Sequence, residues 1–132
     1  MENAIHAIIN TNLLIGWIGM VFGILSGSVI GLFFHRDEWL GGYVSFRRRM
    51  VRLGHISFFG LGFLNILFAL TLTVGSFEIM PVQIASCGLI VGALTMPACC
   101  YICAWRKNLW ILFPIPVVSL FLGTCALLWR WL

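Results

Sequence analysis

The sequence predicts an all-α integral membrane protein, built as a single domain that holds a bundle of four transmembrane helices. Hydrophobic residues make up 61% of the 132 residues and charged residues only 9%, which is more apolar surface than a soluble domain of this size can bury. Four long apolar segments alternate with short polar stretches, and crossing a bilayer takes about 20 apolar residues. We expect spans at about residues 8–34, 53–74, 82–105 and 109–129 of one domain, 1–132.

The basic residues predict how these spans are oriented. Seven of them lie in the two loops that share one side of the membrane: Arg36, Arg47, Arg48, Arg49, Arg52, Arg106 and Lys107. Only Arg130 lies on the other side. The positive-inside rule therefore predicts that both basic loops are cytoplasmic and both termini outside, in a bacterial inner membrane. Because topology accounts for the positive charge, nucleic acid is not an expected partner.

Glycine recurs at every fourth position of the first span, at Gly19, Gly23, Gly27 and Gly31, while Gly16 falls out of this register. In lipid such a repeat forms a smooth groove where a second helix can approach closely. The four-residue spacing drifts around the helix and favours a right-handed crossing with the partner. The end of the groove near Gly27 and Gly31 would also leave room for a flat group.

Two histidines, His35 and His55, fall at the end of the first span and the start of the second. In antiparallel neighbouring helices they would lie at similar depth, which is the arrangement that a b-type haem needs for its two axial ligands. The alternative is that both are interfacial histidines, whose polar tips are comfortable at the membrane edge.

Soft ligands follow one face of the third span, where Met96, Cys99, Cys100 and Cys103 stand at i, i+3, i+4 and i+7. Thiolate and thioether groups on one face are suited to Cu(I). The alternative is that they are ordinary core residues, because cysteine and methionine pack well in membrane helices. Asn65, alone near the middle of the second span, is expected to make an interhelical hydrogen bond.

A basic cluster, Arg47, Arg48, Arg49 and Arg52, precedes the second span. Such clusters set topology and contact anionic lipids. The alternative is docking to an acidic partner or to the propionates of a haem.

Catalytic motifs are missing from the sequence, and its carboxylates all flank the spans or lie at the terminus. We therefore do not expect an independent enzyme. The first hypothesis is a small accessory subunit of a larger integral-membrane complex, such as a respiratory or photosynthetic electron-transfer assembly. It would act through helix packing and through retention of lipid or cofactor, with other membrane subunits and anionic lipids as partners. The alternatives are a haem b cytochrome that uses His35 and His55, and an oligomeric small carrier or soft-metal-handling protein.

Overall fold

The computed structural model describes residues 2–75 and 77–129, and all regular secondary structure in these residues is helical. Its long helices are α1 (Glu2–Phe33), α2 (Phe46–Val74), α3 (Ile79–Trp105) and α4 (Pro114–Leu128), with short 3-10 helices η1 (Trp39–Gly41) and η2 (Lys107–Leu112). Four segments are long and apolar enough to cross a membrane, the fourth combining η2 with α4. The predicted four-helix transmembrane bundle is confirmed.

Two helices begin where hydropathy alone would not place them. α2 starts at Phe46, well before the expected residue 53, because the Ser45 side chain accepts a hydrogen bond from the Arg48 N–H and caps the helix. The fourth span is not one continuous α-helix. The six residues of η2 precede α4, which begins at Pro114, a residue whose missing N–H is tolerated in the first turn of a helix.

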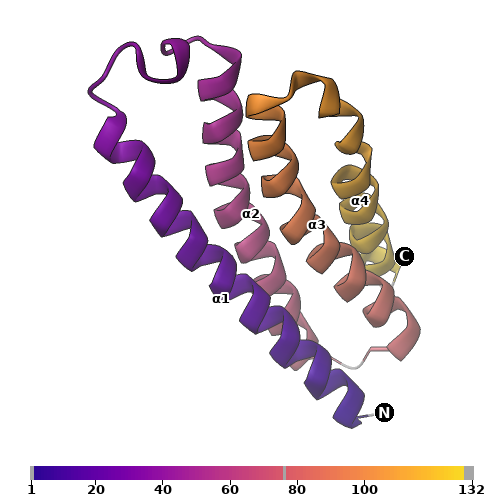
Figure 1. The fold of residues 1–132 in the computed structure, drawn as a ribbon. Helices are drawn as coiled ribbons and strands as arrows, with labels where there is room; N and C mark the ends of the chain where they lie inside the picture. The colour runs from indigo at the N-terminus through magenta and orange to yellow at the C-terminus, as the bar shows by residue number, and fades with distance from the viewer. Residues whose placement is uncertain (1, 76, 130–132) are drawn as a thin grey trace.

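The bundle is open rather than closed. α2 and α3 form its centre, α1 packs mainly on α2, and α4 packs on α3 and η2, while α1 and α4 lie at opposite edges. Figure 1 shows that α1 begins and α4 ends at the same end of the bundle. We call this the terminal end, and the opposite end, which carries residues 34–45 and η2, the basic end.

Glycines of α1 pack directly on α2. A Cβ added at Gly16 would lie 2.8 Å from the Gly62 carbonyl oxygen, and one at Gly19 would lie 3.2 Å from the Phe58 carbonyl oxygen. Gly23 faces the Phe59 ring. The contact positions 16, 19 and 23 of α1 therefore face α2 within the same chain.

The rest of the glycine repeat differs from this pattern. The His55 imidazole occupies the position that a side chain at residue 27 would fill. A Cβ added at Gly31 would meet nothing within 4 Å. The repeat thus packs within the chain as far as Gly27, and only Gly31 stays open. A second glycine contact, between α3 and α4, brings Gly88 and Gly123 together, with a Cβ at Gly123 placed 3.2 Å from the Gly88 Cα.

Two buried amides join α3 to the helices on one side of it, α1 and α2. Asn12 of α1 donates to the Ser86 hydroxyl at 2.6 Å, and Asn65 of α2 donates to the Leu89 carbonyl oxygen at 3.3 Å. Both asparagines are 0% exposed. The interhelical hydrogen bond expected of Asn65 is present, and Asn12 makes a second one to α3.

Arg48 holds the loop between α1 and α2. Its side chain is only 3% exposed, and its guanidinium donates to the carbonyl oxygens of Phe34, Arg36 and Asp37 at 3.2–3.5 Å. The same group lies over the ring of Trp39, 5.6 Å from its centroid. Arg48 therefore donates hydrogen bonds to carbonyls that follow α1, of which that of Arg36 also accepts from the Trp39 N–H.

We expect Arg48→Ala to lower the free energy of unfolding by about 3 kcal/mol, because it removes the charge-assisted hydrogen bonds and ring contacts of a buried guanidinium. Arg49→Ala is the matched control, since this neighbour is exposed and should change stability by no more than about 0.5 kcal/mol. Unfolding in mixed micelles, followed by circular dichroism, gives both values. Equal losses would show that Arg48 does not hold the loop.

We expect Gly62→Ala to destabilise the bundle by about 1–3 kcal/mol, because the added Cβ would lie 2.9 Å from the Gly16 carbonyl oxygen. Gly60→Ala on the same helix meets nothing within 4 Å and should be neutral or stabilising by up to about 1 kcal/mol. The same unfolding assay measures both. If the two variants behaved alike, close backbone contact would not control the packing of α1 on α2.

Candidate functional site

A groove opens at the basic end, where α1 diverges from α2 and α3 (Figure 1). It has a volume of about 450 Å³, which is within the range of small-molecule sites. We call it the basic-end groove, and its lining residues are Ser26, Val29, Ile30, Phe33, Trp39, Leu40, Val51, Tyr101 and Trp105. None of these nine residues is charged, so the groove suits a neutral, largely apolar group.

A polar pair lies beside this groove. The Ser26 hydroxyl oxygen is 3.1 Å from Nδ1 of His55 and donates its proton to the Gly23 carbonyl oxygen at 3.0 Å. Because a hydroxyl has one proton, Ser26 accepts from Nδ1–H of His55, an assignment that leaves Nε2 of the imidazole as an acceptor. The His55 ring is fixed further by an edge-on contact with Phe59, at 5.3 Å between centroids.

Tyr101 of α3 also lines the groove, near Ser26. Its ring packs against Gly54, where an added Cβ would lie 3.0 Å away, and stands 6.1 Å from the Phe58 ring. Its hydroxyl is buried and has the Ser26 side chain as a polar neighbour, but the two make no hydrogen bond of good geometry. Because a buried hydroxyl needs a partner in a membrane helix, Tyr101 and Ser26 are the polar groups that the groove offers to a bound molecule.

The structure does not bring His35 and His55 together. His55 contacts Gly27, which lies six residues before Phe33, the last residue of α1. Six helical residues span about 9 Å, and His35 is exposed still further along the chain. The two imidazoles thus lie at different depths, and the flat group that fits against Gly27 is His55 itself.

The sulfur face of α3 points into the bundle. Cys99, Cys100 and Cys103 are buried, Met96 is partly buried, and the Cys99 thiol donates weakly to the Leu112 carbonyl oxygen at 3.7 Å. Over residues 2–75 and 77–129, no three histidine, cysteine or acidic side chains gather where they would hold a metal ion.

The four arginines of the basic cluster make different contacts. Arg48 is buried in the loop, Arg47 donates to the Ala104 carbonyl oxygen at the end of α3, and Arg52 lies over the Tyr43 ring at 4.5 Å. Arg49 is exposed. The three residues Arg47, Arg49 and Arg52 remain candidates for contact with lipid or a partner.

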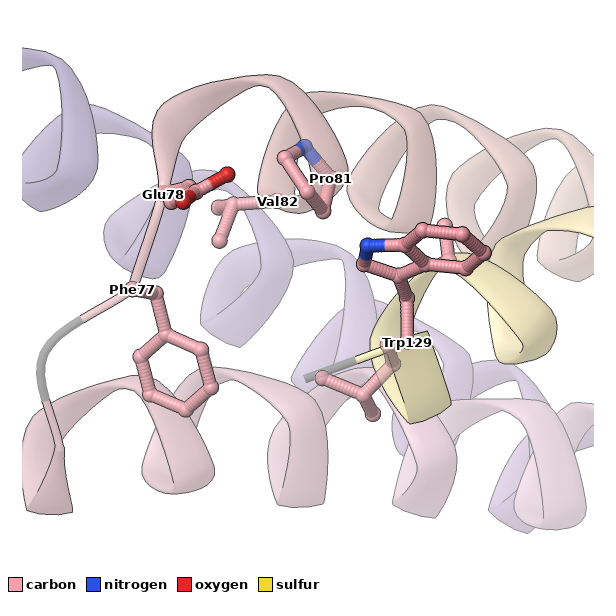
Figure 2. A pocket seen from close by; sticks show the side chains of 7 residues that line it. Phe77, Glu78, Pro81, Val82 and Trp129 are labelled. Atoms are coloured by element: carbon pink, nitrogen blue, oxygen red, sulfur yellow. The ribbon is translucent and has the colours of Figure 1, made fainter. Parts of the chain in front are cut away.

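A second hollow, which we call the terminal-end pocket, lies between the start of α3 and the end of α4 (Figure 2). It has a volume of about 350 Å³ and is lined by Phe77, Glu78, Pro81, Val82, Ala126, Leu127 and Trp129. Sequence analysis pointed to none of these residues, because they come together only through the antiparallel pairing of α3 with α4.

No known protein family, curated protein or solved structure matches this chain. The function therefore has to be argued from the geometry alone.

We expect Tyr101→Phe to change the free energy of unfolding by no more than about 1 kcal/mol, because the hydroxyl it removes is buried and its contact with Ser26 lacks good hydrogen-bond geometry. Tyr101→Leu, which also removes the ring contacts, should lower stability by roughly 1–3 kcal/mol. Unfolding in mixed micelles measures both. A clear loss in the phenylalanine variant would show that the hydroxyl is held by a bond within the chain.

Proposed function

We propose that the chain is a small accessory subunit of a larger integral-membrane complex, an electron-transfer assembly of the bacterial inner membrane. The observation that carries this proposal is the open bundle. Only 11% of the most apolar 18-residue stretch of α1 is buried, and the same holds for the fourth span, against 33% in α2 and 39% in α3. Each edge helix thus offers a long apolar face to helices of other subunits.

The exposed side chains of α1 are large as well as apolar. Trp17, Val21 and Leu25 are 61%, 54% and 56% exposed and recur at every fourth position, so they follow one side of the helix. Helices in lipid associate by van der Waals packing, and a continuous row of large side chains is a surface on which a partner helix can pack.

The basic-end groove supports the second part of the proposal, the retention of a flat, membrane-soluble cofactor or lipid. Trp39 and Trp105 give it aromatic walls, and Tyr101, Ser26 and His55 place hydrogen-bonding groups beside it. Val29 and Trp105 are 52% and 59% exposed, so the groove is accessible from the lipid. In this role the chain holds a molecule in place and does not act as an independent enzyme.

Neither alternative from the sequence gains support from a specific contact. The haem hypothesis needs two histidines at one depth, and the soft-metal hypothesis needs ligands that converge. The geometry of His35, His55 and the sulfur face favours neither arrangement. The exposed Arg47 and Arg49 and the partly exposed Arg52 suit anionic lipids of the cytoplasmic leaflet.

Native purification tests the proposal. We expect the tagged chain, isolated from its own membranes in mild detergent, to migrate with other membrane subunits in one complex of defined size. Replacing Trp17, Val21 and Leu25 of α1 together by Ala should release the chain from that complex, because it removes the apolar row. The triple replacement of Val117, Phe121 and Leu128 by Ala on α4 tests the other edge and should weaken the complex if that edge also contacts a subunit.

Two results would count against this function. The first is that the chain purifies alone as a monomer or small homo-oligomer under conditions that keep other membrane complexes intact. The second is that organic extraction of the purified complex yields no quinone, pigment or lipid whose amount falls in a Tyr101→Leu variant.

A further inference from the structure

The terminal-end pocket has a chemistry that differs from that of the basic-end groove. Of the seven described residues that line it, only Glu78 is charged, and Phe77 and Trp129 give it two aromatic rings. Figure 2 shows Phe77 and Glu78 on the segment that leads into α3, and Trp129 extending from the end of α4 across from them. We infer that this pocket binds an organic ammonium group, either on a soluble molecule or in a lipid headgroup.

The aromatic and acidic residues together are what an ammonium group requires. A cation is attracted to the face of an aromatic ring, and tryptophan is the strongest of the aromatic partners. Trp129 is 74% exposed although it lines a pocket, so its indole is available to a ligand. The methyl or methylene groups around the nitrogen of such a ligand would pack on Pro81 and Val82.

Glu78 supplies the opposite charge. It precedes α3 as the capping residue, but its side chain makes no capping hydrogen bond, so the carboxylate is not committed to the helix backbone. Its charge also offsets the positive end of the α3 dipole, which would otherwise repel a cation. Ala126 and Leu127 lie in the last turn of α4, whose negative dipole end favours a cation.

Other ligand classes fit less well. An anion would be repelled by Glu78, and a neutral apolar group would cover the carboxylate without compensating its charge. A small metal cation would find only one carboxylate among the lining residues, whereas such ions take several oxygen ligands. An ammonium group that carries carbon substituents interacts with both the carboxylate and the aromatic rings of the pocket.

This inference does not depend on the proposed function, because the pocket and the groove lie at opposite ends of the bundle and share no lining residue. The full chain, labelled with 5-fluorotryptophan and placed in phosphatidylglycerol nanodiscs, is titrated with tetramethylammonium chloride. The Trp129 fluorine resonance, assigned by its loss in Trp129→Phe, should shift and saturate. Sodium chloride at equal ionic strength should not cause this shift.

Two internal controls accompany the titration. The resonance of Trp110, which is 68% exposed on η2 at the basic end, should stay unchanged. Glu78→Gln, which keeps the size of the side chain, should raise the half-saturation concentration roughly tenfold, the loss expected for one close charge partner. Glu38→Gln, an exposed carboxylate at the basic end, should have no effect.

Nanodiscs of phosphatidylcholine distinguish the two sources of the group. If the lipid headgroup is the ligand, the Trp129 resonance is already shifted there, and tetramethylammonium has little further effect. If the ligand is soluble, the titration is the same in both lipids. The inference is overturned if Trp129 shows no saturable shift in phosphatidylglycerol, if Trp110 shifts equally, or if Glu78→Gln binds as well as the unmodified chain.

Discussion

The close approach of helix backbones at glycine is the constraint on which the rest of the structure depends. Helices in lipid gain little by burying apolar side chains against each other, since the lipid tails are equally apolar. Stable packing therefore needs short contacts, which Gly16 and Gly62 provide between α1 and α2, and Gly88 and Gly123 between α3 and α4. The bundle is in effect two glycine-paired hairpins, joined along α2 and α3 by larger buried side chains and by the Asn65 hydrogen bond.

The basic-end groove follows from where this close contact ends. From Gly23 onward, α1 faces the Phe59 ring and the His55 imidazole instead of backbone atoms, and these rings hold the helices further apart. The loop that must cross the wider gap contains Leu40, Gly41 and Gly42, all with positive φ angles of 56–92°. For Leu40 that conformation costs roughly 1 kcal/mol, and the hydrogen bonds of buried Arg48 offset it.

Sequence reasoning predicted the helices well and the side-chain contacts less well, for a physical reason. Hydropathy detects each apolar segment separately, so four spans and their approximate positions followed directly from composition. The partner of the glycine repeat depends on the relative register of two helices, which no single segment encodes. For the same reason the Ser26–His55 contact was not foreseen. Arg47, Arg48 and Arg49 look alike in a run of identical residues, yet about 100° of helical rotation separates each from the next, and only Arg48 turns into the loop.

Buried polar side-chain atoms without a hydrogen bond differ in what their residues contribute to the packing of the helices. Three side-chain atoms in the described part of the chain are buried without a hydrogen bond: Oδ1 of Asn12, Oδ1 of Asn65 and the hydroxyl of Tyr101. The amide nitrogens of both asparagines donate interhelical hydrogen bonds. The cost of each unpaired oxygen is therefore offset by a hydrogen bond from the same side chain. The Tyr101 hydroxyl joins no helices by a bond of good geometry, and its polar neighbour is the Ser26 side chain. Both groups line an uncharged groove, and the proposed retention of a lipid or cofactor relies on this pair of hydroxyls.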